Sequence, residues 1–400
     1  MIGIMQVLRN PMSYAVWKLK SVTKGSDLGR VWVEDHSPML MKLRSELGQK
    51  RTFEGLKLGV CLPGTWATFM FLSALEAAGA SLLYYPMFCR PEVGLELLKS
   101  DSVRLFSVGG VGKIVRDSDF VHDSTAFFGK LVVRQRAKTK GIIEQTASGT
   151  IMYKEFQAKG LLRQPVFDLD MSYVKRVGEN VMATGLGLVE ALLKLHVFLP
   201  SKRMLILGYG SVGKGCASYL HSLGCKVSTY DINQEKMAEA EKAGYEVGEL
   251  EQLLPRADIV VNATGSFTPV LGAKELCLLN RGAVLVNMGG TGWDRQFFEG
   301  KRRVEAGSWV SKVFFNDSEY VYEVGQGLPV NFLLASGTDT ETMDVVFSLS
   351  VLAFEYLVQN YGSLPKTLQP IPEEIQRKHI ELVAKYSART DIVDLRKTSQ

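Results

Sequence analysis

Cysteine is scarce in this sequence. The 400 residues contain five cysteines, at positions 61, 89, 216, 225 and 277, and no CxxC pair. An odd and scattered set argues against a disulfide framework and against a structural zinc site. Cys61 and Cys225 lie in or beside apolar runs, where a free thiol behaves as a small hydrophobic side chain. We therefore expect a reducing, cytoplasmic environment and no bound metal.

A long apolar run and a strong charge excess are also lacking. The most apolar stretch, residues 69–88, is interrupted by Glu76 and divided by Gly79, which favours a helix followed by a strand over a membrane span. The apolar runs within residues 1–24 are too short and too interrupted for a signal peptide. A net charge of +5 is modest for 400 residues and argues against a dedicated nucleic-acid binder. Hydrophobic content of 46% and charged content of 22% are typical of a globular protein, here of two or three domains.

A glycine-rich run in mid-chain is the most informative feature that is present. Residues 204–216 read MLILGYGSVGKGC, an apolar strand followed by a glycine turn and a helix. Gly208 suits a tight turn, Gly210 lets the backbone approach a pyrophosphate, and Gly213 lets the helix pack closely on the sheet. We expect this loop, including Ser211 and Val212, to hold a dinucleotide. The alternative is a glycine turn that binds no phosphate.

An acidic residue closes the next strand. Residues 227–231 read VSTYD, and Asp231 stands eighteen residues after Gly213. A carboxylate there accepts hydrogen bonds from the ribose hydroxyls and repels a 2′-phosphate, which favours NAD over NADP. The sequence therefore predicts a Rossmann domain with NAD as cofactor.

The rest of the chain alternates strand-like and helix-like segments. We expect strands at 57–62, 81–85 and 103–108 with a helix at 68–78, and later strands at 259–263, 283–287 and 310–315. This alternation predicts an α/β fold with two doubly wound parallel-sheet domains. A long helix over 180–197 is expected to join them. The helix expected over 343–358 is almost wholly apolar, so we expect it either between domains or in a subunit interface.

Small polar residues follow two of the later strands. Residues 262–266 read NATGS and residues 287–291 read NMGGT. Ligands of open α/β sheets bind at the carboxyl ends of the strands. Thr264 and Gly265 are therefore expected to line the ribose and nicotinamide, although a simple turn stays possible for each loop taken alone.

The order of these motifs resembles the S-adenosylhomocysteine hydrolase family over roughly residues 30–390. The segments that carry the resemblance are 61–68 (CLPGTWAT for the family's CLHMTVET), 141–149 (GIIEQTASG for GISEETTTG), 172–180 (SYVKRVGEN for SVTKSKFDN), 208–216 (GYGSVGKGC for GYGDVGKGC), 287–290 (NMGG for NIGH) and 328–338 (LPVNFLLASGT for RLVNLGCAMGH). The resemblance implies an NAD-binding Rossmann domain (185–337) inserted in a substrate-binding domain (1–184). Residues 338–400 are expected to be a helical return to the substrate domain or to an oligomer interface.

A mechanism comes with the resemblance. Such enzymes keep NAD bound, oxidise the 3′-hydroxyl of the substrate's ribose, eliminate the thiol, add water and reduce the ketone again. Lys175 matches the family's base, and Glu179 matches its aspartate partner. These residues are four apart, so a continuing helix would place both on one face. An exposed helix ion pair is the alternative reading of the same spacing.

Further residues match the family's binding positions. Thr146, Ser148, Asn180 and Asn331 match cofactor-side positions. Thr65, Gln145 and Thr338 stand at substrate-side positions, with Gln145 in place of a glutamate that holds the ribose hydroxyls.

The family's histidines for elimination and water addition are missing. Pro63, Gly290 and Thr338 stand at their three positions, and none of them shuttles a proton at neutral pH as imidazole does. Ala67 replaces a glutamate involved in reading adenine. The aspartate near the elimination site has only Asp123 as a nearby candidate.

Three functions follow from this selective pattern. The first is an NAD-dependent oxidoreductase acting on a hydroxyl or ketone of a nucleoside-like, sugar-like or other small substrate. The second is a residual or altered thioether hydrolase, and the third is a non-catalytic NAD-binding regulator. The resemblance and the apolar helix predict a homo-oligomer, a dimer or a tetramer. The chain's last residues, 394–400, read DLRKTSQ and lack the family's basic, aromatic tail, which makes the stoichiometry insecure.

Overall fold

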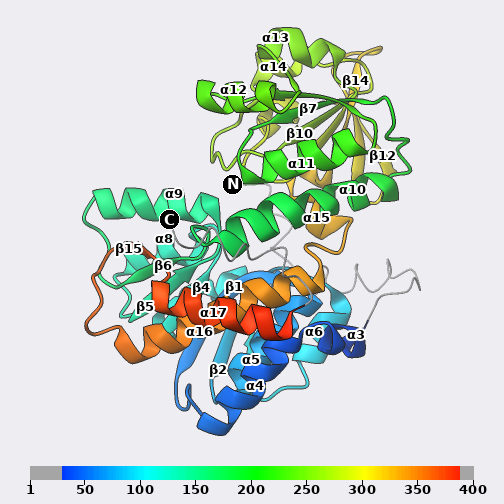
Figure 1. Cartoon of the computed structure of the whole chain (residues 1–400). Coiled ribbons are helices and arrows are strands. Elements are labelled where there is room, and N and C mark those ends of the chain that lie inside the picture. Colours follow the sequence, from blue (N-terminus) through cyan, green and yellow to red (C-terminus); the bar gives the residue numbers. More distant parts are fainter. Residues whose placement is uncertain (1–28, 388–400) are drawn as a thin grey trace. The chain divides into compact units, whose positions relative to one another are not determined.

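The computed structural model of the chain describes residues 29–387, which form two compact units (Figure 1). Unit 1 contains residues 29–175 and 339–387, and unit 2 contains residues 176–338. The first boundary falls earlier than residue 184 because the linking helix begins at Val174, and most of it belongs to unit 2. The expectations for residues 1–24 and 394–400 lie outside the described residues.

Unit 1 is built on a seven-stranded sheet with the strand order β15-β6-β5-β4-β1-β2-β3. All neighbouring strands in it are parallel. The chain adds β2 and β3 on one side of β1 and then β4, β5, β6 and β15 on the other side, so the strand order changes direction between β1 and β4. The strands are β1 (Lys57–Gly64), β2 (Ser81–Cys89), β3 (Val103–Leu105), β4 (Phe120–Asp123), β5 (Gly141–Glu144), β6 (Val166–Asp168) and β15 (Leu368–Pro370). Strands β4, β5, β6 and β15 were not individually expected, and the strand expected over 103–108 ends at Leu105.

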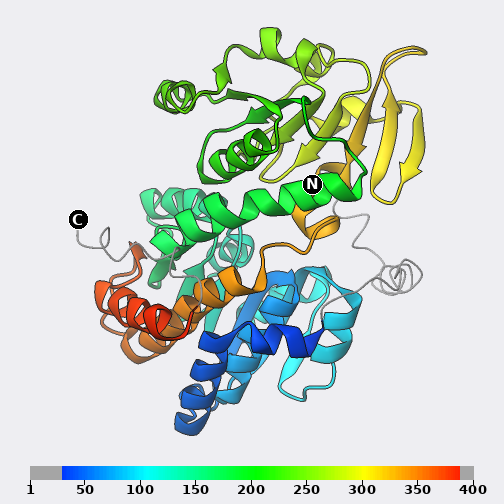
Figure 2. The same cartoon turned by 45° about the vertical axis from the view of Figure 1, so that its right-hand side comes forward.

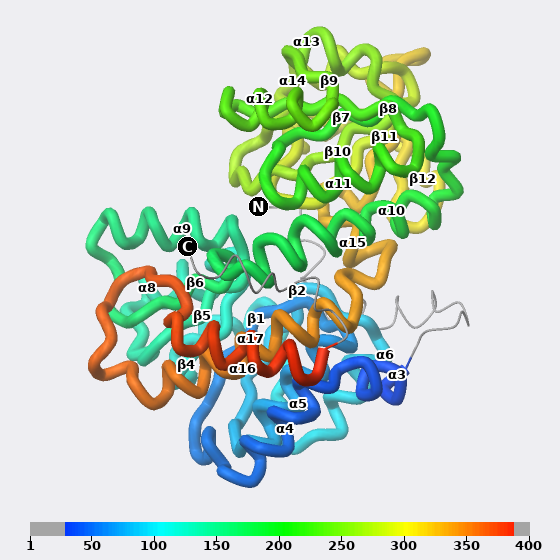
Figure 3. Tube along the Cα trace, in the orientation of Figure 1, coloured from blue at the N-terminus to red at the C-terminus, as the bar shows by residue number. Residues whose placement is uncertain are grey.

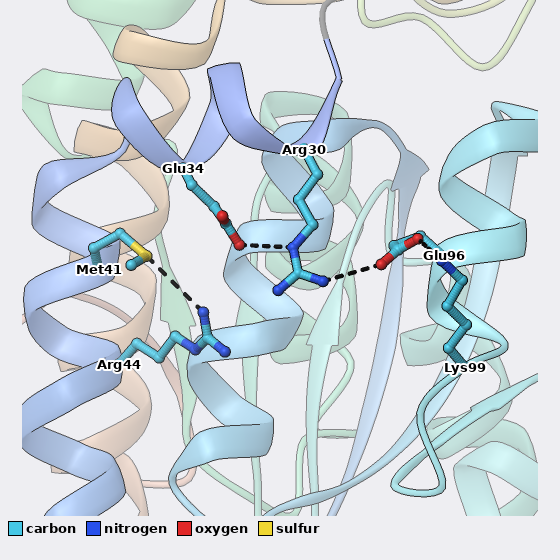
Figure 4. A network of polar contacts seen from close by, with 6 residues as sticks. All are labelled: Arg30, Glu34, Met41, Arg44, Glu96 and Lys99. Carbon is cyan, nitrogen blue, oxygen red and sulfur yellow. Dashed lines mark hydrogen bonds and ion pairs between the residues drawn. The ribbon is translucent and has the colours of Figure 1, made fainter.

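Helices and one 3-10 turn connect the strands of this sheet. They are α3 (Arg30–Asp35), α4 (Pro38–Lys50), α5 (Trp66–Ala77), α6 (Pro91–Leu97), α7 (Val111–Asp117), α8 (Phe127–Gln135), α9 (Ala147–Ala158), α16 (Thr340–Asn360) and α17 (Glu373–Tyr386), with a 3-10 turn at Val108–Gly110. Figure 4 shows how α3 is tied to α6: Arg30 Nε lies 2.7 Å from Glu34, and Arg30 Nη1 lies 3.0 Å from Glu96. Such exposed ion pairs contribute at most about 1 kcal/mol each.

The apolar helix α16 lies inside the core of unit 1. It packs against α4, α5, α17 and β5, and nearly all of its side chains from Thr342 to Phe354 are buried (Figure 2, orange). The expectation that it lies between domains or in a subunit interface is therefore wrong. A helix that is apolar on every side needs neighbours on every side, and unit 1 supplies them from its own chain.

Asp344 is a buried carboxylate on α16. It accepts hydrogen bonds from the backbone nitrogens of Met39 and Leu40, at 3.0 and 2.8 Å, and so caps the start of α4 from a distant part of the chain. Burial raises the pKa of Asp344 to about 7. At pH values between the ordinary pKa of a carboxyl group and about 7, Asp344 is protonated in the folded chain and ionised in the unfolded chain. Asp344 therefore makes the folded state more stable in mild acid than above neutrality.

We expect Asp344→Asn to destabilise unit 1 more at about pH 5 than at about pH 8. The substitution removes this titration, and it replaces one accepting oxygen by a donor, which costs about 1–3 kcal/mol. Urea unfolding at the two pH values measures the difference. Glu381 is an exposed carboxylate on α17, and Glu381→Gln is the control. It should change the free energy of unfolding by the same amount at both pH values. An Asp344→Asn effect that does not vary with pH would contradict the expectation.

Unit 2 is built on an eight-stranded sheet with the order β12-β13-β14-β11-β10-β7-β8-β9. The six strands from β14 to β9 are parallel, while β12, β13 and β14 form an antiparallel edge (Figure 2, yellow). The strands are β7 (Arg203–Leu207), β8 (Lys226–Tyr230), β9 (Glu246–Val247), β10 (Ile259–Asn262), β11 (Val284–Asn287), β12 (Arg303–Gly307), β13 (Val310–Phe314) and β14 (Tyr320–Val324). The expected strand over 310–315 is β13, and its two antiparallel neighbours were not expected.

The linking helix changes type along its length. Residues Val174–Ala183 are a π-helix, and α10 (Thr184–Lys194) continues as an α-helix. The expected single helix over 180–197 is therefore wrong in type and in both ends. The other helices and turns of unit 2 are α11 (Ser211–Ser222), α12 (Gln234–Lys242), α13 (Leu250–Leu253), α14 (Ala273–Leu276) and α15 (Val330–Leu333), with 3-10 turns at Leu254–Arg256, Arg295–Phe298 and Gly325–Gly327.

Within residues 29–387, no helix is long and apolar enough to cross a membrane. In the same range no three His, Cys, Asp or Glu side chains are grouped so that they could hold a metal ion.

Candidate functional site

The glycine-rich run makes the turn from β7 into α11 (Figure 3). Gly208 has φ of 92°, and a Cβ there would lie 2.8 Å from Cγ2 of Thr264. A Cβ on Gly213 would lie 1.9 Å from the carbonyl oxygen of Gly208, so only glycine lets the helix start this close to the strand. Gly210 differs, because a Cβ there would meet no atom within 4 Å. Its backbone faces open space at the N-terminal end of α11, where an anion is favoured.

Asp231 follows β8 and holds the glycine turn. Its Oδ2 accepts from the backbone nitrogen of Tyr209 at 2.8 Å, and its Oδ1 accepts from Asn233 at 2.9 Å. A carboxylate has about four acceptor positions, so two remain for ribose hydroxyls. The side chain is only partly buried, which leaves those positions accessible.

Two buried asparagines organise the next part of this edge. Asn262 and Asn287 are paired in register on β10 and β11, and Asn262 Nδ2 donates to Asn287 Oδ1 at 2.7 Å. Thr264 Oγ1 donates to Asn262 Oδ1 at 2.9 Å, and Asn287 Nδ2 donates to the carbonyl of Gly327 at 2.6 Å. These two amides therefore connect three loops to one another. Their burial shows that the amides support the edge rather than line it.

Gly290 occupies a position with no room for a side chain. Its nitrogen donates to the carbonyl of Thr264 at 2.6 Å, and a Cβ would lie 2.1 Å from the carbonyl oxygen of Ser266. A Cβ on the neighbouring Gly289 would be equally close to Thr264 O, at 2.2 Å. The loop after β11 is thus pressed against the loop after β10, and the histidine that the family has at this position could not stand here without moving both.

We expect Gly290→His to destabilise unit 2 by about 3 kcal/mol or more, because the added atoms must displace backbone rather than a flexible side chain. Thermal unfolding followed by circular dichroism measures the loss. Gly109→His is the matched control, since a Cβ at Gly109 meets no atom within 4 Å. Equal melting temperatures for the two variants would show that the loops can move apart cheaply.

Asn331 and Thr338 lie towards the end of unit 2. Asn331, in α15, is buried, its carbonyl accepts from Gly337 at 2.8 Å, and its side-chain Oδ1 has no hydrogen-bond partner among the described residues. A buried amide oxygen left in this state is a position where a ligand amide or hydroxyl would bind. Thr338 follows Gly337, whose φ is 84°.

Lys175, Glu179 and Asn180 share the π-helical segment Val174–Ala183. Lys175 closes unit 1, and the other two belong to unit 2. All three side chains are buried, with 4%, 8% and 9% exposed. Such burial is inconsistent with the alternative reading of Lys175 and Glu179 as an exposed helix ion pair. π-Helix is rare in proteins, and its turns are frequently found at functional sites.

His122 is a buried histidine of unit 1 to which the sequence assigned no role. It lies on β4, with Nε2 3.3 Å from Ser350 Oγ and its ring 5.1 Å from that of Phe71. Burial lowers the pKa of His122 to about 3, and the positive charge of Lys175 adds to this effect. The imidazole is therefore neutral at physiological pH. It is packed in the core and does not substitute for the missing histidines.

Two of the three substrate-side residues, Thr65 and Gln145, lie at the carboxyl edge of the unit 1 sheet, as do the cofactor-side residues Thr146 and Ser148. Thr65 follows β1 and caps α5 by accepting from Thr68 N at 3.3 Å. Gln145 follows β5; it is buried, and its Oε1 has no hydrogen-bond partner among residues 29–387. Thr146 caps α9 by accepting from Gly149 N at 3.2 Å, and its hydroxyl also bonds Glu144. Ser148 lies in the first turn of the same helix.

Sequence reasoning missed the buried carboxylate Glu144. It accepts from the backbone nitrogens of Thr125 and Ala126 at 3.1 and 3.0 Å. Burial raises the pKa of Glu144 to about 8, and the nearby charge of Asp123 adds to it. Only its place beside Gln145 in the GIIEQ segment hinted at a role.

The carboxylate oxygens of Asp123 are likewise occupied by hydrogen bonds from the surrounding protein. It accepts from the backbone of Ser124, Phe128 and Gly129 and from the Tyr153 hydroxyl, at 2.8–2.9 Å. Burial raises the pKa of Asp123. Its oxygens hold the loop after β4, so it is a structural residue in this conformation rather than an open acid beside a substrate.

The residues of unit 2 fit NAD. Gly210 leaves open space over the start of α11, Asp231 has unused acceptor positions, and Asn331 presents a buried unpaired oxygen. The predicted Gly208, Ser211, Val212 and Gly213 lie in one turn, and Thr264 and Gly265 follow the adjacent strand β10. The expected cofactor residues of unit 2 are therefore brought to one edge of one sheet. Thr146 and Ser148 belong to unit 1 and Asn180 to the linking segment.

Comparison with known proteins agrees with this fit. Residues 181–336 match the family described as S-adenosyl-L-homocysteine hydrolase, NAD binding domain. The chain is 26% identical over 383 residues to an adenosylhomocysteinase of Aeropyrum pernix, covering 90% of each chain. It is 26% identical over 399 residues to an S-inosyl-L-homocysteine hydrolase of Methanococcus maripaludis, covering 94% of this chain and 95% of that one. Among solved structures, a dipicolinate synthase from Bacillus halodurans matches 75% of this chain and 97% of its own, at 14% identity and a TM-score of 0.42.

The family match covers the whole of the glycine turn, Asp231 and the two asparagine-held loops, and the full-length relatives extend it over unit 1. NAD is accordingly the cofactor of unit 2. Residues 181–336 thus match the NAD-binding domain of the S-adenosyl-L-homocysteine hydrolase family, and the whole chain is similar to proteins that carry the names of this family's hydrolases.

Proposed function

We propose that this protein is an NAD-dependent oxidoreductase that acts on a hydroxyl or ketone of a nucleoside-like, sugar-like or other small substrate. The observation that carries the proposal is Gly290, where the packing of two backbone loops leaves no room for the histidine of the family. Pro63 and Thr338 stand at the other two histidine positions. The unit 2 residues that fit NAD support hydride transfer to and from a substrate, whereas the elimination and water-addition steps would lack the family's histidines as proton carriers.

When bound, NAD supplies hydride transfer to or from a carbon that carries a hydroxyl or keto oxygen. Lys175 is proposed as the base that takes the hydroxyl proton, and Glu179 as the residue that positions it. Thr65, Gln145 and Thr338 are proposed to hold the substrate by hydrogen bonds, the unpaired Oε1 of Gln145 being an open acceptor. We propose that NAD is bound by the named residues of unit 2 together with Thr146 and Ser148, and that the substrate is bound by Thr65 and Gln145 of unit 1 and by Thr338 of unit 2.

A thioether hydrolase is the second candidate. It is supported by the names of full-length relatives, which act on adenosyl or inosyl thioethers of homocysteine. The absence of the family's glutamate at Ala67 favours a base other than adenine, and therefore S-inosyl-homocysteine as the first thioether to try. In such a reaction the proton carriers would have to be water or Thr338, which predicts slow turnover.

One experiment separates these functions. The NAD-loaded protein is incubated with adenosine, inosine, the two homocysteine thioethers and a panel of sugars, while the reduced-nicotinamide absorbance and free thiol are followed. An absorbance change without thiol supports the oxidoreductase, and thiol release supports the hydrolase instead. Neither signal with any compound, at high protein concentration, would reject both in favour of a non-catalytic NAD-binding regulator.

We further propose a cytoplasmic homo-oligomer, a dimer or a tetramer. The support is the resemblance to the family alone, since α16 is accounted for within unit 1. Light scattering of the NAD-loaded protein tests it, and a monomer at micromolar concentration would contradict it.

A further inference from the structure

A cavity of about 420 Å³ lies in unit 2, away from the cofactor edge. Its walls are the residues that precede three neighbouring strands: Lys202 before β7, Asp258 before β10, and Arg281 before β11. The turn after α10, with His196 and Phe198, closes one side. The volume is in the range of small-molecule sites, towards its lower end.

The cavity and the cofactor loops lie at opposite ends of the same strands. Gly208, Ala263 and Met288 follow β7, β10 and β11 at their carboxyl ends, whereas the cavity residues precede these strands. Strand β10 has four residues, so the two ends are separated by about 13 Å. The cavity is therefore a separate site rather than an extension of the NAD site.

Its cationic side chains have no contacting carboxylate, although the charge of Lys202 acts on Asp258 from a distance. Within the part of the chain that the structure describes, Lys202, Arg281 and His196 make no ion pair or hydrogen bond through their side chains, and Arg281 only stacks over Tyr320 at 5.3 Å. Asp258 lines the same cavity, but Arg203 binds both of its oxygens, with Nη2 at 2.8 Å and the backbone nitrogen at 2.9 Å. Two cationic side chains and an imidazole are thus left facing a cavity whose one carboxylate is already paired.

The remaining wall is apolar. Phe198 is 75% exposed, the second largest value among the exposed large hydrophobic residues, and Val197 and Val284 lie beside it on the cavity wall. An aromatic ring held open next to unpaired cations suits a ligand with an oxyanion at one end and a flat apolar body at the other. We propose that this cavity is a second small-molecule site, which binds an aromatic phosphate or carboxylate.

Phenyl phosphate and benzoate are the probes, with phenol and inorganic phosphate as the two half-ligands. Titration calorimetry is done on the full chain saturated with NAD, so that the cofactor site is filled. We expect phenyl phosphate or benzoate to bind at least about tenfold more tightly than either half-ligand; which of the two is tighter identifies the oxyanion. No heat from either probe at millimolar concentration, or phenol binding as tightly as phenyl phosphate, would overturn the proposal.

Substitutions locate the site. The double variant Lys202→Gln, Arg281→Gln should weaken binding at least about tenfold, as expected when charge-assisted hydrogen bonds are lost. Phe198→Ala should weaken phenyl phosphate and leave inorganic phosphate unchanged. Lys242→Gln, an exposed lysine in the last turn of α12, is the control and should bind normally. Unchanged binding in the double variant, with its melting temperature also unchanged, would place the ligand elsewhere and reject this site.

Discussion

Lys175→Ala is expected to lower the turnover of the oxidised or reduced substrate about a thousandfold, the usual contribution of a positioned base. The side chain is 4% exposed and lies in the π-helical segment that joins the two units. The variant should bind NAD as the parent does, because Lys175 is not one of the residues proposed to bind the cofactor. Steady-state kinetics with the substrate identified by the screen, together with an NAD titration, measure the two effects separately.

Arg176→Ala is the matched control for this prediction. Arg176 is the next residue on the same segment and is exposed, so its removal changes charge without changing a buried group. It should retain normal turnover. If Lys175→Ala also keeps its turnover while binding NAD, Lys175 is not the base. If both variants lose NAD, the segment is needed for folding. The test then uses Lys175→Arg, which keeps the charge and most of the volume, and this variant alone should lose turnover.

The second large effect is expected from two glycines of the same turn. Gly213→Ala should abolish NAD binding and destabilise unit 2 by about 3 kcal/mol or more, because its Cβ would lie 1.9 Å from the Gly208 carbonyl. Gly210→Val should leave the fold intact, since a Cβ there meets no protein atom within 4 Å. It should nevertheless weaken NAD at least about a hundredfold, about 2.8 kcal/mol, by filling the space for the pyrophosphate.

Thermal unfolding and an NAD titration of each variant check this pair. The two glycines are only three residues apart, yet Gly213 is expected to be required for folding of unit 2 and Gly210 for binding of NAD. Normal NAD affinity in a folded Gly210→Val variant would show that the pyrophosphate does not lie over this turn. A Gly213→Ala variant with the parent's melting temperature would show that α11 can shift away from β7 without cost.

Local pattern was enough to predict much of unit 2. Short local segments were predicted well, because their conformation depends on neighbouring residues. They are the glycine-rich run over 204–216, the strand end at Asp231, and the buried strands at 259–262 and 284–287. The same applies to the caps Thr65 and Thr146, where a hydroxyl three residues before a backbone N–H bonds to it. The α/β class with two parallel sheets followed from the alternation of such pieces.

Contacts between distant residues could not be predicted in this way. The apolar run over 343–358 looks the same whether it ends in a core or in an interface, and only its packing against α4, α5 and α17 decides between them. The antiparallel strands β12 and β14 were missed; β12 carries little apolar patterning, and both strands depend on pairing with β13. The π-helical turn at 174–183 has no local signature that distinguishes it from an α-helix.

The sequence by itself indicated NAD as the cofactor and predicted a glycine turn and an acidic strand end as its site, because both features depend on residues that are adjacent along the chain. Tertiary structure alone decided that Gly290 cannot carry a side chain, since the obstacle is the backbone of a loop 24 residues earlier. It likewise decided that Asp123 and Glu144 are occupied by backbone N–H groups, and that Asn262 and Asn287 bond to each other. These facts depend on which loops lie side by side, and that is a property of the folded chain, not of any segment of it.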